Sequence, residues 1–295
     1  MTTVFESKHV QDLLHRASGK DQKDGDPRFK EIMYDLLSGL FQTIEKHNVT
    51  EDELWKAVNF IGEASPELGL IVPGIGLEHY MDVLMDEADK KQGITGGTPR
   101  TIEGPLYVEG APLSQGEAVM SDKEDDGEVL MMEGVIKDTD GNPVPNAMVE
   151  VWHADTRGFY SHFDPTGLQA DFNNRRRIQT GADGKYKFRS IMPVGYSVPP
   201  NGSTDRLMKA MGRHGSRPAH IHFFVQAEGY RHLTTQINIA DDPLVYDDFA
   251  YATREELIPE LNRTSDHAEI NFDFELVPNS DAVRYELSER KRLSA

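Results

Sequence analysis

Cysteine is absent from the 295-residue sequence, so the chain can form neither a disulfide nor a thiolate metal site. A metal ion in this protein would therefore be bound by His, Tyr, Asp or Glu side chains. The absence of cysteine is also typical of proteins that work in a reducing compartment, so we expect a cytoplasmic protein.

Basic residues are scarce as well. The chain has 31 Lys and Arg against 50 Asp and Glu, which gives a formal net charge of -19. Nucleic acids and anionic membranes favour clusters of Lys and Arg, and a run as short as Arg175–Arg177 does not supply one, so we expect neither partner. No segment approaches the roughly 20 apolar residues of a membrane span, and the first residues lack a signal-peptide pattern, so we expect no membrane insertion.

The first third of the chain has the apolar spacing of helices. An Asp-Pro step at residue 26 is typical of a helix start, and apolar residues recur every three or four positions from Phe29 to Ile44. Thr50 and Glu53 have the spacing of a capping box before a second helix. The stripe from Phe29 to Ile44 needs a surface to cover it, which a neighbouring helix or a second copy of the chain could provide.

Beyond the glycine-rich loop GITGGTPR the apolar period changes to two. Strands are predicted over Val129–Lys137 and Ala147–Trp152, joined as a hairpin through a tight turn at Asp140-Gly141. Several short strands with long connections predict a sandwich rather than a parallel α/β sheet. The predicted fold is α+β, with a helical domain over residues 1–100, an antiparallel β-sandwich over 101–280 and a charged C-terminal tail over 281–295.

The segment from Gly212 to Val225, GRHGSRPAHIHFFV, contains the clearest candidate metal ligands. Apolar residues alternate there with His220 and His222, which predicts a strand whose two imidazoles point the same way. Two such imidazoles can chelate one metal ion, and neutral imidazole suits zinc, copper, iron and nickel. The pattern fits two hydrogen-bonded histidines on a polar face equally well, so spacing alone leaves both interpretations open.

Two tyrosines are further candidates because each follows a glycine in a loop that leaves a predicted strand. Tyr160 lies in DTRGFYS, and Tyr196 lies in MPVGYS. A phenolate is a hard, anionic donor, so two His and two Tyr together would favour Fe(III) over Zn(II) or Fe(II). Each tyrosine taken alone is better explained as a half-buried residue with a hydrogen-bonded hydroxyl.

Six motifs give the sequence a family resemblance. In chain order they are TPRTIEGPLYVEGAP, VEVWHADTRGFYS, MPVGY, GRHGSRPAHIHFFV, HLTTQIN and DDFAYATR. In these motifs the chain resembles the intradiol ring-cleaving dioxygenases, and most closely their catechol 1,2-dioxygenase branch. The resemblance is strong over residues 95–277, and it extends to the helical region through PRFK and GLEHY.

The resemblance implies a mononuclear non-haem Fe(III) centre and assigns residues to it. The implied iron ligands are Tyr160, Tyr196, His220 and His222. Tyr196 is also the implied base, which leaves the metal and takes a substrate proton, while Arg217 stabilises negative charge on the substrate and Gln236 is a positioning residue. The implied substrate-pocket residues are Leu70, Pro73, Ile102, Phe249 and Ala250.

The implied reaction is the cleavage of catechol by O2 to cis,cis-muconate, with both oxygen atoms incorporated, in the β-ketoadipate pathway of aromatic compound catabolism. The resemblance also implies a homodimer formed through the helical region, with a phospholipid bound at that interface. One departure from the family pattern is a short connection before Asp248. We expect it to alter the rim of the site more than the iron ligands.

Three alternatives stay open from the sequence. Within the family, the activity could be that of a hydroxyquinol or chlorocatechol 1,2-dioxygenase, although Leu70 and Pro73 favour catechol. Outside it, the hairpin sequence also fits a non-catalytic β-sandwich binding module. A zinc hydrolase could use His220 and His222 with an acidic third ligand such as Asp248, and it would be colourless.

Overall fold

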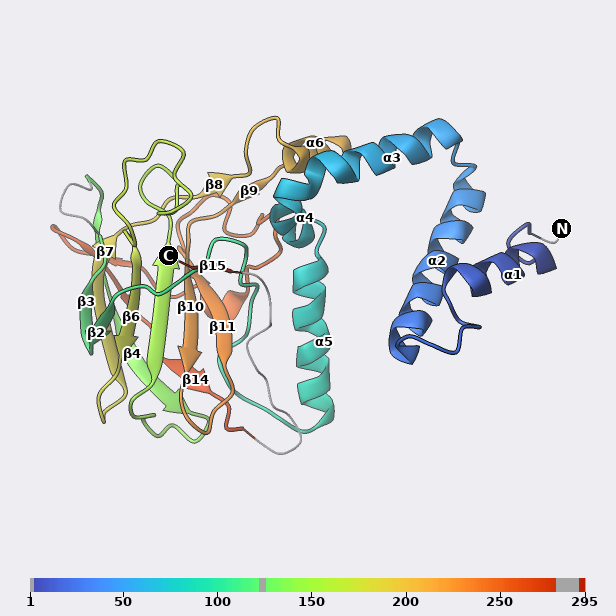
Figure 1. Cartoon of the computed structure of the whole chain (residues 1–295). Helices are drawn as coiled ribbons and strands as arrows, with labels where there is room; N and C mark the ends of the chain where they lie inside the picture. The colour runs from blue at the N-terminus through green and yellow to red at the C-terminus, as the bar shows by residue number, and fades with distance from the viewer. Residues whose placement is uncertain (1–2, 122–125, 280–291, 295) are drawn as a thin grey trace. The chain divides into compact units, whose positions relative to one another are not determined.

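The computed structural model describes residues 3–121, 126–279 and 292–294, and it divides the chain into two compact units, Met1–Ser65 and Pro66–Ala295 (Figure 1). This boundary lies earlier than the one at residue 100 that the glycine-rich loop predicts. The reason is that the later helices contact the strand-rich part: Asp89 of helix α5 (Leu77–Lys91) pairs with Arg231 at 2.8 Å. The predicted C-terminal tail lies mostly outside the described residues.

The first unit contains helices α1 (Lys8–Ala17), α2 (Pro27–His47) and α3 (Glu51–Ala64). Both predicted helix starts are confirmed. The Asp26 carboxylate accepts the first backbone N–H groups of α2, and the capping box forms between Thr50 and Glu53. The predicted stripe on α2 also exists, but none of its residues is buried, and several are exposed, with Phe29 at 61% and Leu36 at 62%.

The second unit is built around two sheets, together with helices α4 (Leu68–Gly74), α5 and α6 (Ser203–Ala210). The first sheet has the order β11 (Leu233–Asn238), β10 (His220–Gln226), β5 (Met148–His153), β6 (Arg175–Gln179), β2 (Leu113–Gln115). The second has the order β12 (Asn262–Arg263), β13 (Ala268–Asn271), β4 (Val129–Asp138), β7 (Lys185–Ile191), β3 (Glu117–Val119), and β14 (Phe274–Leu276) also pairs with β4. The remaining strands are β1 (Val108–Glu109) with β15 (Leu293–Ser294), and β8 (Tyr196–Ser197) with β9 (Ser216–Arg217).

The predicted sandwich is confirmed, with one refinement. The central pairs, such as β10 with β5 and β4 with β7, are antiparallel. Some outer pairs are parallel instead: β2 with β6, β3 with β7, and β13 and β14 with β4. Apolar side chains from both sheets form the main core, in which Ile221, Phe223 and Val225 of β10 are fully buried. The alternation along β10 therefore directs His220 and His222 to the opposite face of the sheet.

The predicted hairpin between β4 and β5 is wrong, because the two strands belong to different sheets. The tight turn does form: Gly141 N donates to Asp138 O, and Pro143 makes a short antiparallel bridge with Lys137. Asn146 then adopts a left-handed conformation, with φ 55°, and the chain crosses to the other sheet, where β5 pairs with β10 and β6.

No single helix among the described residues has both the length and the apolar composition of a membrane span. The segments Glu51–Gly74 and Leu77–Lys91 meet these limits only when they are taken together as a bent pair.

Candidate metal centre

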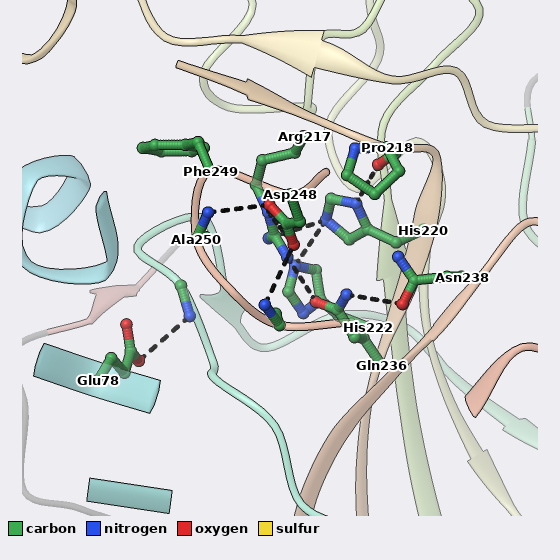
Figure 2. Close-up of polar contacts among 12 residues, drawn as sticks. Glu78, Arg217, Pro218, His220, His222, Gln236, Asn238, Asp248, Phe249 and Ala250 are labelled. Atoms are coloured by element: carbon green, nitrogen blue, oxygen red, sulfur yellow. Dashed lines mark hydrogen bonds and ion pairs between the residues drawn. The ribbon is translucent and has the colours of Figure 1, made fainter. Parts of the chain in front are cut away.

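Strands β10 and β11 place the two predicted histidine ligands and two amide side chains on one face of the five-stranded sheet. In the antiparallel register His222 lies opposite Gln236, and His220 lies opposite Asn238 (Figure 2). Residues opposite one another in a ladder share a face, so the imidazoles and the amides are neighbours. This face is also shielded from solvent, because the residues His220, His222 and Gln236 are all at least 98% buried.

Three polar groups converge on His220 Nε2. The His222 Nε2 atom is 3.1 Å away, the Tyr160 hydroxyl oxygen 3.3 Å, and an N–H of Arg217 donates to it across 3.0 Å. The other ring nitrogen of His220, Nδ1, lies 2.6 Å from Pro218 O. Since Nδ1–H donates to that carbonyl, the Nε2 atom presents its single lone pair to all three groups.

These spacings are those of ligands around one cation. Two ligand atoms about 2.1 Å from an ion and at a right angle to each other are about 3.0 Å apart, close to the separations around His220. Among the described residues, no group of three or more His, Cys, Asp or Glu side chains could hold a metal ion. A metal centre at the two histidines therefore depends on the tyrosines.

Two loops bring Tyr160 and Tyr196 together. Their ring centroids are 5.5 Å apart, and that of Tyr196 is 5.6 Å from the His220 ring. Gly158 makes this approach feasible: its φ is +83°, and a Cβ there would lie 3.0 Å from the Cβ of Tyr196. In the short ladder of β8 and β9, Tyr196 also pairs with Arg217. The structure thus brings together all four predicted ligands from three places in the chain: β10, β8 and the connection between β5 and β6.

Burial decides the protonation of these groups. It lowers the pKa of His220 to about 3, with a further contribution from the Arg217 charge, and it lowers the pKa of His222 well below its ordinary value. Both imidazoles are therefore neutral, which is the form that binds metal ions. Burial raises the pKa of Tyr160 well above its ordinary value. Ionisation of that phenol inside the protein would need a nearby cation of high charge.

Arg217 is held by a buried network. Its Nε and Nη2 atoms donate to Asp248 at 3.1 and 3.0 Å, and Nη2 also donates to Gln236 Oε1 at 2.7 Å. Burial alone would lower the pKa of Arg217, but the charge of Asp248 raises it above its ordinary value. Asp248 also accepts the backbone N–H of Ala250 at 3.0 Å. Asp248 is thus the counter-ion of Arg217, which argues against its use as a zinc ligand.

An aromatic layer backs the histidines. The Trp152 ring stacks on that of His222, with centroids 5.0 Å apart and an interplanar angle of 7°. Tyr107 and Phe224 pack around the same tryptophan. Sequence reasoning missed Trp152 and the Asp248 ion pair. Trp152 is the last residue of the predicted strand Ala147–Trp152, but only the register of β5 with β10 places it beside His222.

The predicted substrate-pocket residues lie in one part of the second unit. Ile102, Phe249 and Ala250 belong to a buried apolar cluster, and Leu70 of α4 packs against it. Pro73 is buried on the same helix. The cluster also contains three buried residues that the sequence did not suggest, Val198, Met208 and Ala252. Gly104 borders the sheet face that carries His220 and His222, since a Cβ on Gly104 would lie 3.9 Å from His222 Cε1. The backbone N–H of Gly104 donates to the Glu78 carboxylate (Figure 2).

Comparison with known proteins gives this arrangement a family. The family model described as Dioxygenase matches residues 102–278, and the model described as Catechol dioxygenase N terminus matches residues 26–93. The chain belongs to the intradiol ring-cleaving dioxygenases. The family resemblance seen in the motifs is thereby confirmed.

Individual relatives of this intradiol dioxygenase agree with the family model. Catechol 1,2-dioxygenase from Acinetobacter baylyi is 50% identical over an alignment of 306 positions, which covers 99% of this chain and 98% of that protein. The solved structure of catechol 1,2-dioxygenase from Acinetobacter sp. ADP1, inhibited by bound mercury, superimposes with a TM-score of 0.96 at 49% identity, covering 100% of both chains. The enzyme from Pseudomonas arvilla C-1 gives a TM-score of 0.92 at 44% identity, covering 99% of both chains. The chain is therefore an oxidoreductase, and the non-catalytic binding module was a wrong alternative.

Proposed function

We propose that this protein is a catechol 1,2-dioxygenase, which cleaves the catechol ring between its two hydroxylated carbons with O2 to give cis,cis-muconate. The observation that carries the proposal is the convergence of two imidazole nitrogens and two phenols beside a buried arginine. The relatives named catechol 1,2-dioxygenase, about half identical over nearly the whole chain, support this choice of substrate.

The donor set fits a mononuclear non-haem Fe(III), held by Tyr160, Tyr196, His220 and His222. Two hard phenolates and two neutral imidazoles favour a trivalent ion over zinc. When bound, Fe(III) supplies a Lewis acid that binds catechol through its oxygens and withdraws electron density, which makes a ring carbon reactive toward O2.

The two tyrosines differ in their surroundings, and so do their proposed roles. Tyr160 is only 2% exposed and belongs to the buried aromatic cluster that also contains Trp152 and Phe224, so it is suited to remain a ligand. Tyr196 is half-buried, packs at the edge of that cluster and lies on a strand of only two residues. Its greater exposure supports Tyr196 as the base whose phenolate oxygen accepts a proton from a catechol hydroxyl.

Arg217 is the proposed electrostatic catalyst. Its guanidinium carries a fixed positive charge beside His220, in a buried site where such a charge acts strongly on a reacting group. The hydrogen bonds that it donates to Asp248 and Gln236 fix its orientation before substrate binds. Arg217 would stabilise the negative charge that develops on the catechol during the reaction.

The apolar cluster around Ile102 and Phe249 would hold the catechol ring, together with Ala250 and the α4 residues Leu70 and Pro73. An apolar pocket with few polar groups suits an unsubstituted ring better than one with a third hydroxyl. Hydroxyquinol and chlorocatechol remain the alternative substrates, and they differ from catechol by one ring substituent each.

The exposed stripe on α2 supports a homodimer as the functional state, because contiguous apolar residues such as Phe29 and Leu36 are commonly covered by a partner. A phospholipid whose acyl chains share this surface completes the proposed assembly. Sedimentation of the purified protein and mass spectrometry of its lipid extract test these two points. The lack of cysteine supports a cytoplasmic enzyme of the β-ketoadipate pathway.

The proposal is tested by steady-state turnover of the iron-loaded protein with catechol, hydroxyquinol and 4-chlorocatechol. Oxygen consumption equal to muconate formation, with the highest kcat/KM for catechol, is the expected result. A higher kcat/KM for either of the other substrates would reassign the substrate, and no oxygen uptake with any of the three would contradict the proposed reaction.

A further inference from the structure

Arg213 joins two segments that are far apart in the sequence. One of its guanidinium N–H groups donates to Gly74 O at 2.6 Å, and another donates to Phe249 O at 2.9 Å. The same guanidinium lies over the ring of Tyr251, 4.7 Å from its centroid. Arg213 precedes Arg217 by four residues, so it lies on the segment that leads into β9 and then to His220 and His222.

The two carbonyls belong to the two segments that carry most of the proposed substrate-pocket residues. Gly74 is the last residue of α4, which carries Leu70 and Pro73, and Phe249 is itself one of the proposed pocket residues. The two segments approach closely, since a Cβ on Gly74 would lie 2.8 Å from Cε2 of the Phe249 ring. Glycine at position 74 permits this approach, and the Arg213 bridge links the two segments.

The chemistry of arginine suits this bridge. The last carbonyls of a helix lack partners within the helix and carry partial negative charge, so a cation at the end of α4 is favourable. A guanidinium presents several N–H groups in a rigid plane, and it can therefore hold two carbonyls at a fixed separation. A lysine ammonium is a single flexible point charge and cannot impose that spacing.

We propose that Arg213 is a specificity-determining positioning residue, which fixes the width of the pocket between α4 and Phe249 and so limits the ring substituents that can enter. This role rests on the proposed function. The described contacts of Arg213 involve neither the four proposed ligands nor Arg217. Loss of the bridge should therefore change the choice of substrate more than the chemical step.

The test uses full-length, iron-loaded Arg213→Met and measures kcat/KM for catechol, 4-methylcatechol and 4-chlorocatechol. We expect the ratio of 4-chlorocatechol to catechol to rise by about tenfold, the scale on which a pocket distinguishes one small apolar group, while kcat for catechol stays within about threefold. Arg213→Lys keeps the positive charge but not the bridge, so it should raise the ratio as well, by a smaller factor.

Arg263→Met is the matched control. Arg263 also makes several polar contacts, with Glu128 and Asp241, but it lies on an exposed part of the second sheet. Its loss should lower the thermal midpoint without changing the ratio. If both Arg213 variants lower the midpoint and keep the wild-type ratio, Arg213 only stabilises the fold and the proposal is overturned.

Should Arg213→Met fail to fold, Arg213→Lys alone decides, and an unchanged ratio in that variant also overturns the proposal. Wild-type protein that turns over none of the three substrates would instead overturn the proposed function, and the role of Arg213 with it.

Discussion

Replacing Asp248 with asparagine should leave the Arg217 guanidinium buried without its counter-charge. The side chains of Arg217 and Asp248 are only 4% and 1% exposed, and they are 3.0 Å apart. Asparagine has nearly the same shape and keeps an oxygen for the backbone N–H of Ala250. The substitution therefore removes charge and leaves the packing almost unchanged.

The size of the effect follows from burial. Removing one partner of a buried ion pair costs about 3–5 kcal/mol, because the remaining charge has lost both water and its partner. We expect the lower end of this range, about 3 kcal/mol, since Gln236 still accepts from Arg217 at 2.7 Å. A misaligned Arg217 should also lower kcat/KM by about 10- to 100-fold, as is typical when a residue that orients an active-site group is lost.

Guanidinium chloride unfolding at neutral pH and fixed protein concentration measures the free energy, and steady-state turnover of catechol measures the activity. The matched control is Glu87→Gln, which breaks an exposed pair whose Glu87 and Lys90 side chains are 52% and 71% exposed. Solvent screens such a pair, so this variant should behave like the wild type. If Asp248→Asn is as stable and active as Glu87→Gln, the Asp248 carboxylate does not hold Arg217 and this reasoning is refuted.

Three further predictions concern the base, the catalyst and a buried carboxyl. Tyr196→Phe should retain most of its iron but lose the proton acceptor, so turnover falls and the visible band changes; unchanged turnover would exclude the base role. Arg217→Ala should lower kcat more than it raises KM, because the charge acts on the developing negative charge; a pure KM effect would assign Arg217 to ground-state binding. Burial raises the pKa of Asp82 to about 7 from its ordinary value of 3.8, so the folded protein holds this proton more tightly than the unfolded chain does. Its contribution to stability is complete below about pH 4 and is lost as the pH rises to about 7, so Asp82→Asn should flatten the stability profile in that range; an unchanged slope between pH 4 and 8 would contradict the burial argument.

Local patterns predicted much of the fold. The caps at Asp26 and Thr50 involve residues only two or three positions apart, so the sequence alone identifies them. Alternation along β10 likewise indicated that His220 and His222 share a face, and the observed register places Gln236 on the same face as His222.

Features that depend on long-range packing could not be predicted. The sequence between β4 and β5 has every signal of a hairpin, but which sheet the second strand joins depends on its pairing with β10 and β6. Asp248 is 31 residues from Arg217, and no period in the sequence links the two. The context of Tyr160 and Tyr196 made them candidates, but their proposed ligand role depends on the family resemblance, since neither segment has a spacing that indicates a metal site.

The most direct test of the account is the visible spectrum of the purified, iron-loaded protein in air, repeated after catechol is added without oxygen and again once oxygen is admitted. Iron held by two tyrosines and two histidines should give a red protein with a phenolate-to-Fe(III) band that moves to longer wavelength with catechol, followed by the absorbance of muconate. A protein that stays colourless and free of iron after reconstitution would contradict the assignment of Tyr160, Tyr196, His220 and His222 as iron ligands.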